Sequence, residues 1–324
     1  MKEDSGLVFG FLLDGAGGGK KFSFDDVKNW SSDHGTLWLH LDYTVDKAKN
    51  WLYNESGLDP IIVESLVTEE TRPRSLVHKS GMLVILRGVN LNPESDPEDM
   101  VSVRLWIDSN LIVTLYRRNV MAITELREAV ENGSGPTGSG AFLEDLSDRL
   151  VVRMGSVIAD IDDSVDALED EVLSEQNYEL RRKISDIRRT AIAMRRYVSP
   201  QRDVIAHLYN EKVDWLNEIE RMRIRETADR TTRYIEDLDS VRDRATVTQE
   251  ELNNRLAEQM NKTMYVLAIV AGVFLPLGLL TGLFGINIGG MPGTDSKWAF
   301  AIFCILLLMI ATVQIWFFKK KKWM

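Results

Sequence analysis

A seam of residues spaced by three and four runs from residue 247 to residue 285, partly polar before the first apolar segment and mostly small within it. These positions are Val247, Glu250, Asn254, Ala257, Asn261, Met264, Ala268, Ala271, Leu275, Gly278, Gly282 and Gly285. A strict seven-residue repeat places such positions on one side of a supercoiled helix. This seam could line an aqueous passage, because polar groups would contact water and small residues would leave width for a partly hydrated ion.

The alternative interpretation is ordinary close packing, since small residues at this spacing let membrane helices approach one another. A tight contact between two helices gives no reason for Asn254 and Asn261 to share the seam. A ring of helices around a central pore accounts for both the polar and the small positions. The pattern therefore favours a pore.

Two uncharged apolar segments, Tyr265–Phe284 and Trp298–Phe318, are joined by the loop 285–297. Each has about the twenty residues that a helix needs to cross a bilayer. Lys319, Lys320, Lys321 and Lys322 follow the second segment, while the loop carries one lysine and one aspartate. Positive residues stay on the cytoplasmic side, so we expect both termini inside. A simple tail anchor for a cytosolic domain is the alternative.

The composition limits the remaining classes of function. The net charge of −10 argues against nucleic-acid binding. The single cysteine, Cys304, lies in the second apolar segment and excludes an intrachain disulfide. The four histidines have no partners at metal-ligand spacing, so the sequence predicts no closed Cys/His zinc site. We see no cleaved signal peptide at the N-terminus.

Residues 1–135 are predicted to form a cytosolic α/β domain. The expected strands are Leu7–Leu13, Thr36–Tyr43, Met82–Val89, Val101–Ile107 and Leu111–Tyr116, and the expected helices are Val45–Glu55 and Ile61–Glu69. Asp59-Pro60 is expected to open the second helix. The glycine-rich run 14–19 lacks the ending of a phosphate-binding loop and favours a hairpin turn. The Gly/Ser-rich segment 132–140 is the expected domain boundary.

Residues 141–211 are predicted to form a charged helical hairpin, because the acidic block 160–175 precedes the basic run 181–196. The two faces could pair with each other in solvent, or the acidic one could attract cations or a basic ring near the membrane. A stalk helix is expected over 212–264, continuing into the first span at 265–284. It would be on the order of 110 Å long from about Lys212 to Phe284 and should pack against copies of itself or the preceding helices.

The end of the first span resembles that of the CorA superfamily of divalent metal ion transporters. Its Gly-x-Asn signature appears as Gly285-Ile286-Asn287, and Met291-Pro292 follows shortly after. Arg72-Pro73-Arg74, ahead of a predicted strand, is also similar to the family's N-terminal domain. The resemblance implies a non-enzymatic, funnel-shaped homopentamer in the bacterial inner membrane. Stalk helices would line its single axial pore, and 298–318 and 319–324 would form the second span and a basic cytosolic tail.

Two departures place the resemblance within the family. Ile286 stands where the magnesium-transporting branch has methionine, and the loop around Met291-Pro292 has no acidic residue before Asp295. Gly-Ile-Asn with this loop is similar to the zinc-transporting ZntB branch. The resemblance therefore implies transport of Zn²⁺, with Mg²⁺, Co²⁺, Ni²⁺ and Cd²⁺ as further candidate ions and a magnesium/cobalt channel as the alternative.

The resemblance also implies roles for individual residues. Asn287 would contact a hydrated ion at the outer mouth, because amide oxygens can bind a cation without stripping all its water. Gly285 and Ile286 would set the turn that exposes it, and Met264 and Leu267 would form apolar gates. The pore-lining set comprises Asn261, Met264, Leu267, Ala271, Leu275, Gly278 and Gly282.

The four terminal lysines would ring the inner mouth of the pore. The expected partners are further copies of the chain, the lipid bilayer and divalent cations, with no resident cofactor. A membrane-tethered helical scaffold or signalling protein is the alternative of another class.

Overall fold

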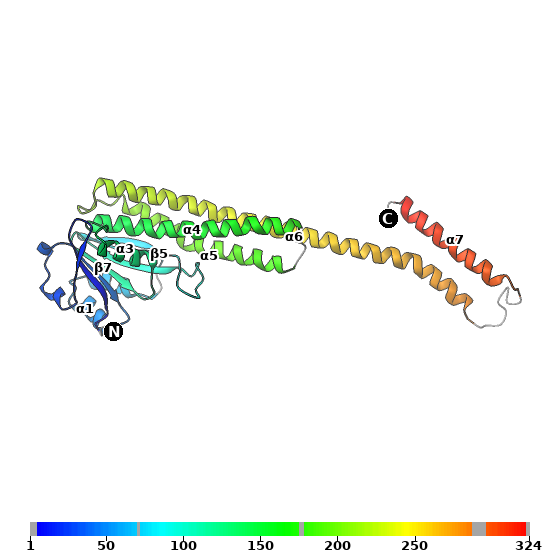
Figure 1. Ribbon diagram of the computed structural model, residues 1–324, viewed down its shortest axis with the longest axis horizontal. Coiled ribbons are helices and arrows are strands. Elements are labelled where there is room, and N and C mark those ends of the chain that lie inside the picture. The colour runs from blue at the N-terminus through cyan, green and yellow to red at the C-terminus, as the bar shows by residue number, and fades with distance from the viewer. Residues whose placement is uncertain (1–4, 70–71, 175–177, 287–295, 322–324) are drawn as a thin grey trace. The chain divides into compact units, whose positions relative to one another are not determined.

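The computed structural model describes residues 5–69, 72–174, 178–286 and 296–321. The chain divides into two compact units, Met1–Gln249 and Glu250–Met324. The first unit contains a sheet and the helices packed on it, and the second contains two apolar helical segments (Figure 1).

The first unit is built on a seven-stranded sheet in the order β2-β1-β3-β7-β6-β5-β4. Its strands are β1 (Leu7–Leu13), β2 (Gly19–Lys21), β3 (Leu37–Asp42), β4 (Arg74–His78), β5 (Gly81–Gly88), β6 (Val101–Ile107) and β7 (Leu111–Tyr116). Strands β3 and β7 pair in parallel, and the other neighbours pair antiparallel. The predicted α/β class and all five predicted strands are confirmed, while β2 and β4 escaped prediction.

Helices cover both faces of this sheet. On one face α1 (Asp46–Asn54) and α2 (Pro60–Val67) bury Leu39 and Leu41, and on the other α3 (Met121–Glu131) buries Trp38. Burial on both faces explains why the central strands are almost continuously apolar. Asp59 Oδ1 accepts a hydrogen bond from the Ile61 backbone N–H at 3.0 Å, so the predicted opening of α2 is confirmed.

The glycine-rich run forms the turn between β1 and β2. Leu13 pairs with Gly19, and Asp14 Oδ1 accepts hydrogen bonds from the backbone N–H groups of Ala16 and Gly18 at 2.8 and 2.9 Å. The predicted hairpin is confirmed. The aspartate fills the position that an anion would need, because it satisfies the N–H groups of the loop.

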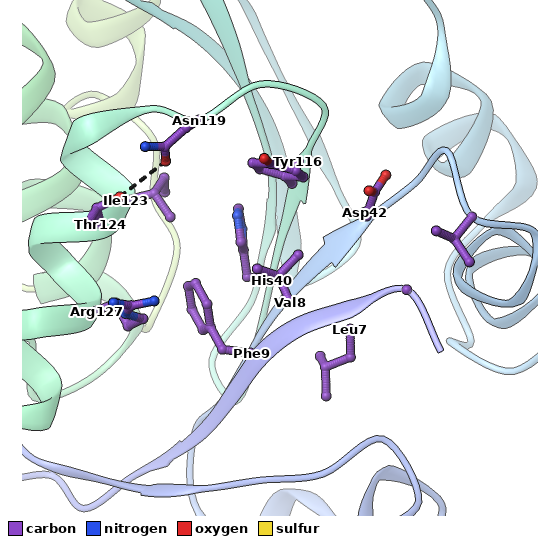
Figure 2. A pocket seen from close by; sticks show the side chains of 12 residues that line it. Leu7, Val8, Phe9, His40, Asp42, Tyr116, Asn119, Ile123, Thr124 and Arg127 are labelled. Carbon is purple, nitrogen blue, oxygen red and sulfur yellow. Dashed lines mark hydrogen bonds between the residues drawn. The ribbon is translucent and has the colours of Figure 1, made fainter. Parts of the chain in front are cut away.

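His40 of β3 lies buried on the α3 face, where its ring stacks on Phe9 with centroids 4.7 Å apart (Figure 2). Its Nδ1 lies 2.8 Å from Thr114 Oγ1 on β7. Burial lowers the pKa of His40 to about 3, Arg127 lowers this pKa further, and Asp42 opposes the shift. The imidazole is therefore neutral at physiological pH.

This lowered pKa predicts a specific loss of stability in acid. Between pH 6.5 and 3 the unfolded chain protonates this histidine and the folded chain does not, so stability falls as pH decreases. The expected loss from this group is about 2 kcal/mol at pH 5. Thermal melts of wild type and His40→Gln between pH 7.5 and 5 measure it. If the melting temperatures of the two proteins fell equally with decreasing pH, the lowered pKa of His40 would be contradicted.

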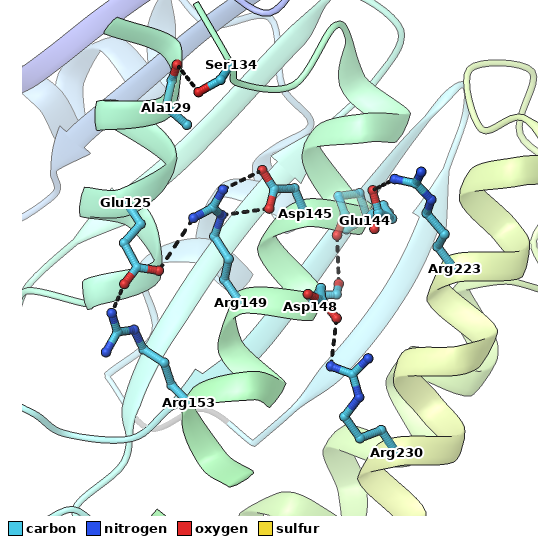
Figure 3. A network of polar contacts seen from close by, with 12 residues as sticks. Glu125, Ala129, Ser134, Glu144, Asp145, Asp148, Arg149, Arg153, Arg223 and Arg230 are labelled. Carbon is cyan, nitrogen blue, oxygen red and sulfur yellow. Dashed lines mark hydrogen bonds and ion pairs between the residues drawn. The ribbon is translucent and has the colours of Figure 1, made fainter. Parts of the chain in front are cut away.

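Three long helices pack side by side against the sheet. They are α4 (Ser139–Ser174), α5 (Tyr178–Leu208) and the first part of α6 (Glu218–Phe284). Glu144 of α4 contacts Arg223 of α6 at 3.5 Å, and Asp148 contacts Arg230 at 3.0 Å (Figure 3). The two contacts follow the same order along both helices. Helices α4 and α6 are therefore parallel. Helix α5 runs antiparallel to both and connects the end of α4 to the start of α6.

One apolar core joins these helices to the sheet, because Phe142 of α4, Ile205 of α5 and Ile224 of α6 belong to the same cluster as Trp38. Residues 132–138 of the Gly/Ser-rich segment separate α3 from α4 inside the first compact unit, and Ser139 and Gly140 already belong to α4. The expected domain boundary there is thus a connection between two helices. The Gly/Ser pattern correctly predicted a break between helices, but it did not reveal that the helices after it share one apolar core with the sheet.

The acidic and basic blocks of α4 and α5 pair only partly with each other. Glu171 contacts Lys183 at 3.0 Å across the hairpin, as expected. Arg244 of α6, however, pairs with acidic residues of α4, namely Asp162, Asp166 and Glu169. Much of the predicted complementarity is therefore directed to α6, which lies beside α4.

Helix α6 begins at Glu218, six residues later than the stalk boundary expected at Lys212. Asn217 Oδ1 accepts hydrogen bonds from the N–H groups of Ile219 and Glu220 at 2.9 and 3.0 Å. Glu220 Oε2 in turn accepts from the Asn217 N–H at 2.8 Å. This reciprocal cap starts a new helix, and the Asn-x-x-Glu spacing is the signal that could have predicted it.

Gly140 permits the close approach of α4 to the start of α6. A Cβ at this position would lie 2.7 Å from the Trp215 carbonyl oxygen, a backbone atom, and would also collide with the Glu220 carboxylate. We expect Gly140→Ala to destabilise the first unit by about 1–3 kcal/mol, measured as a lower melting temperature. Gly138→Ala is the matched control, because its Cβ would meet nothing within 4 Å. Equal melting temperatures for the two variants would contradict this explanation.

Candidate functional site

The second unit contains the end of α6 and α7 (Ala299–Lys320). In the part of the chain that the structure describes, these are the two helices long and apolar enough to cross a membrane. Helix α6 ends at Phe284, the residue at which the first apolar segment was expected to end.

Helices α6 and α7 face each other along one stripe on each. Gly272 lies against Phe318, where an added Cβ would be 3.1 Å from the ring, and Phe284 packs on Phe303 with centroids 4.9 Å apart. The partly buried positions of α6 between these two contacts include Val273, Leu277 and Leu280. This stripe fixes which side of α6 is taken by α7.

The seam lies on the opposite side of α6. The seam positions Asn261, Met264, Ala271, Leu275, Gly278 and Gly282 are all exposed, and so is Leu267, the predicted gate residue that flanks the seam. Since successive residues of an α-helix are rotated by about 100°, positions 271, 275, 278 and 282 fall roughly half a turn from 273, 277, 280 and 284.

The seam has no neighbour within the described chain. Met264 is 56% exposed, Leu267 is 63% exposed and Leu275 is 72% exposed. A Cβ added at Gly278 or Gly282 would meet nothing within 4 Å. Small side chains here leave an open face along the helix.

The helix end carries the first part of the predicted Gly-x-Asn turn. The Gly285 N–H donates to the Gly282 carbonyl at 3.3 Å, and a Cβ on Gly285 would approach the Thr281 carbonyl to 2.9 Å. Glycine is therefore suited to the tight end of α6. Ile286 is exposed, and Asn287 lies outside the described residues.

The predicted basic ring begins in the last turn of α7. Lys319 and Lys320 belong to the helix, Lys321 follows it, and Lys322 lies outside the described residues. The Lys320 ammonium lies 4.9 Å from the Trp316 ring centroid. Positive charge at this end is favourable for the helix dipole and for anionic lipid headgroups.

Within the described ranges, no group of three or more His, Cys, Asp or Glu side chains lies together in a geometry that could hold a metal ion. The seam itself offers amide, thioether and methyl groups, with small residues between them. Such a surface suits a hydrated cation that keeps most of its water, because hard divalent ions give up water reluctantly.

A family model described as CorA-like Mg2+ transporter protein matches residues 33–320. The chain belongs to this CorA-like family. The predicted family is thus confirmed, and membership together with the two long apolar helices makes the chain a membrane protein.

Relatives of this CorA-like chain match it over nearly its whole length. The divalent cation transporter CmaX of Pseudomonas aeruginosa is 38% identical, with 99% of this chain and 98% of the relative covered. The zinc transport protein ZntB of Yersinia pestis is 36% identical, with 99% of this chain and 97% of the relative covered.

Solved structures agree with the fold. The full-length CmaX structure matches with a TM-score of 0.86 at 37% identity, covering 98% of both chains. The CorA magnesium transporter of Methanocaldococcus jannaschii matches with a TM-score of 0.83 at 18% identity, covering 98% of this chain and 99% of that one. The second likeness supports the fold alone.

Proposed function

We propose that this chain assembles as a homopentamer and carries divalent metal cations, zinc above all, through a central pore lined by the seam of α6. One observation carries the proposal. The small and polar residues of the seam occupy the face of α6 turned away from α7, and every predicted pore-lining position is exposed. Further copies of the chain would cover that face and leave a narrow axial passage.

Zinc is the preferred cargo in this proposal. Its support is the Gly285-Ile286-Asn287 sequence motif and the ZntB relatives, which are named as zinc transport proteins. The CmaX relative is named more broadly as a divalent cation transporter. Magnesium and cobalt are therefore the competitors that a transport assay must include, with nickel and cadmium as further arms.

Each predicted site residue has a place in this scheme. Asn287 binds the hydrated ion at the outer mouth, Met264 and Leu267 close the pore as apolar rings, and the terminal lysines surround the inner mouth. Both termini lie in the cytoplasm, because the lysines and Arg255 flank the two spans on that side. None of these roles requires bond-making chemistry or a resident cofactor.

Transport and assembly can be tested on the purified full chain. Native mass spectrometry in mild detergent is expected to show a pentamer, and proteoliposomes containing a zinc-sensitive dye are expected to show zinc influx. Unlabelled magnesium and cobalt ions serve as competitors. A stable monomer or dimer would overturn the pore, and an assembled protein without any divalent-cation flux would favour the scaffold alternative.

A further inference from the structure

A cavity of about 770 Å³ lies in the first unit, at the carboxyl ends of β3 and β7 (Figure 2). His40 and Tyr116 come from these strands, Phe9 comes from β1, and Ile123 and Arg127 come from α3. Its volume is within the range of about 300–1,000 Å³ typical of small-molecule sites.

The cavity occupies a topological switch point of the sheet. Strands β3 and β7 are parallel neighbours, but α1 follows β3 onto one face and α3 follows β7 onto the other. When the connections after two parallel strands go to opposite faces of the sheet, they leave a crevice beyond the carboxyl ends of the strands. Open α/β sheets bind ligands in such a crevice. The register shift in β1 between Leu7 and Phe9 adds Val8 to the wall of this crevice.

His40 offers a hydrogen-bond donor to this cavity. Thr114 Oγ1 accepts from Trp38 Nε1 at 2.9 Å, lies 2.8 Å from His40 Nδ1 and is 3.3 Å from the Leu39 carbonyl oxygen, to which it can donate. If Nδ1 accepts from the Thr114 hydroxyl, the neutral ring carries its hydrogen on Nε2, and this is the tautomer that binding of an anion at Nε2 requires. Among the described residues, Nδ1 is the ring nitrogen that has a side-chain hydrogen-bond partner, and His40 is only 5% exposed.

Positive charge lies on the opposite wall. Arg127 is close enough to His40 to lower its pKa, and it stands over the Phe9 ring at 5.8 Å. Its Nε lies 4.0 Å from Glu131 Oε2, whereas Lys21 contacts Oε1 of the same carboxylate at the shorter distance of 3.3 Å. Helix α3 has no acidic residue in its first turn and no side-chain cap. The acidic group that lines the cavity, Asp42, is engaged by Thr44, whose N–H and hydroxyl donate to its Oδ1 at 2.9 and 2.6 Å. The donors on the α3 side therefore favour an anion.

The remaining walls are apolar and aromatic. Phe9 packs edge-on against Trp38 with centroids 4.9 Å apart, and Tyr116 meets the His40 ring at 5.6 Å. Val8 and Ile123 complete this surface. An inorganic anion would fill a small part of the volume and leave these rings in contact with water.

We propose that this cavity binds a small aromatic carboxylate, with its carboxylate between Arg127 and His40 Nε2 and its ring against Phe9 and Ile123. The planar guanidinium and the imidazole N–H present donors that suit two carboxylate oxygens. The site is independent of the ion path, because all its residues belong to the first unit.

Isothermal titration of the full chain in detergent with sodium benzoate tests the proposal. Benzoate is expected to bind, and benzamide, its neutral isostere, is expected to bind at least about tenfold more weakly, which is about 1.4 kcal/mol. Arg127→Gln should weaken benzoate binding at least tenfold. Arg118→Gln is the matched control, because this exposed arginine lies in the same segment outside the cavity, and it should leave binding unchanged.

A second variant separates binding from charge. Thr124→Trp keeps Arg127 and places a large ring in the cavity, so it should abolish benzoate binding. Because it also removes the hydrogen bond that Thr124 Oγ1 donates to Asn119 Oδ1 at 3.1 Å, a small fall in melting temperature is expected, and binding is measured below the melting transition. Absence of benzoate binding, or equal affinity in wild type and Arg127→Gln, would overturn the proposal. Tighter binding of AMP or inorganic phosphate than of benzoate would overturn the carboxylate class. The measurement reads binding directly, so its outcome is separate from that of the zinc-flux assay.

Discussion

Replacing Asn287 with alanine is expected to reduce zinc uptake into proteoliposomes by at least about a hundredfold, while expression and pentamer assembly stay intact. A side-chain amide can replace or hydrogen-bond the water around a divalent ion, whereas a methyl group cannot, and leaving such an ion without its polar partners costs several kcal/mol. Because one substitution removes this group from every subunit of a symmetric pore, the loss is multiplied around the ring.

The control for this experiment is Asn253→Ala. Asn253 is an exposed asparagine of α6 that lies outside the seam, so its loss should leave both uptake and assembly unchanged. Native mass spectrometry establishes that each variant is still a pentamer before its flux is compared. Unchanged zinc flux through an assembled Asn287→Ala protein would remove this residue from the ion path.

Much of the fold could be predicted because its signals are local in the sequence. Alternation and apolar runs identified β1, β6 and β7 to the residue, and β3 and β5 within one residue at each end. The two uncharged segments coincide closely with the end of α6 and with α7. Length and apolar composition alone predict such helices, without any knowledge of tertiary contacts. The Gly-x-Asn motif then identified the family that the comparison confirmed.

Other features depend on contacts between distant parts of the chain. Strand β4 (Arg74–His78) is largely exposed and has no clear alternation, so only its pairing with β5 defines it. Helix α3 has an apolar face that packs on the sheet, but no side-chain cap marks its start. Its end is marked by Gly133 at φ 75°, a signal that we interpreted from the sequence as part of a domain boundary. Asn217 and Glu220 did provide a local signal for the start of α6, which the long run without Gly or Pro concealed.

The candidate site shows the same division. The seam could be derived from spacing alone, because one helix carries all its residues. The face that α7 occupies could not, because it depends on Phe303 and Phe318 meeting positions on another helix. The cavity below α3 was missed for a related reason, since its walls combine residues near positions 8, 40, 116 and 127.

The seam and the surface that contacts α7 lie on different faces of α6. A substitution on the seam side can therefore test the gate by whether it raises or lowers ion flux. Replacing Leu267 with serine is expected to wet the apolar constriction and raise basal zinc leak by about tenfold or more, because a hydrophobic gate closes by excluding water. Leu267 is 63% exposed within the chain, so the change removes little packing inside the subunit. Met264→Ser should act in the same direction, since Met264 lies on the same open face.

Leu277→Ser is the matched control, because Leu277 is partly buried on the face turned toward α7. It should lower the melting temperature, with a cost of roughly 2 kcal/mol or more for a large-to-small change at a packed site, and leave the leak unchanged. If the seam were only a packing surface between subunits, Leu267→Ser would instead weaken the pentamer without any gain of flux. A Leu267→Ser protein that stays pentameric and leaks no faster than wild type would therefore contradict the gate and leave the seam as an assembly surface.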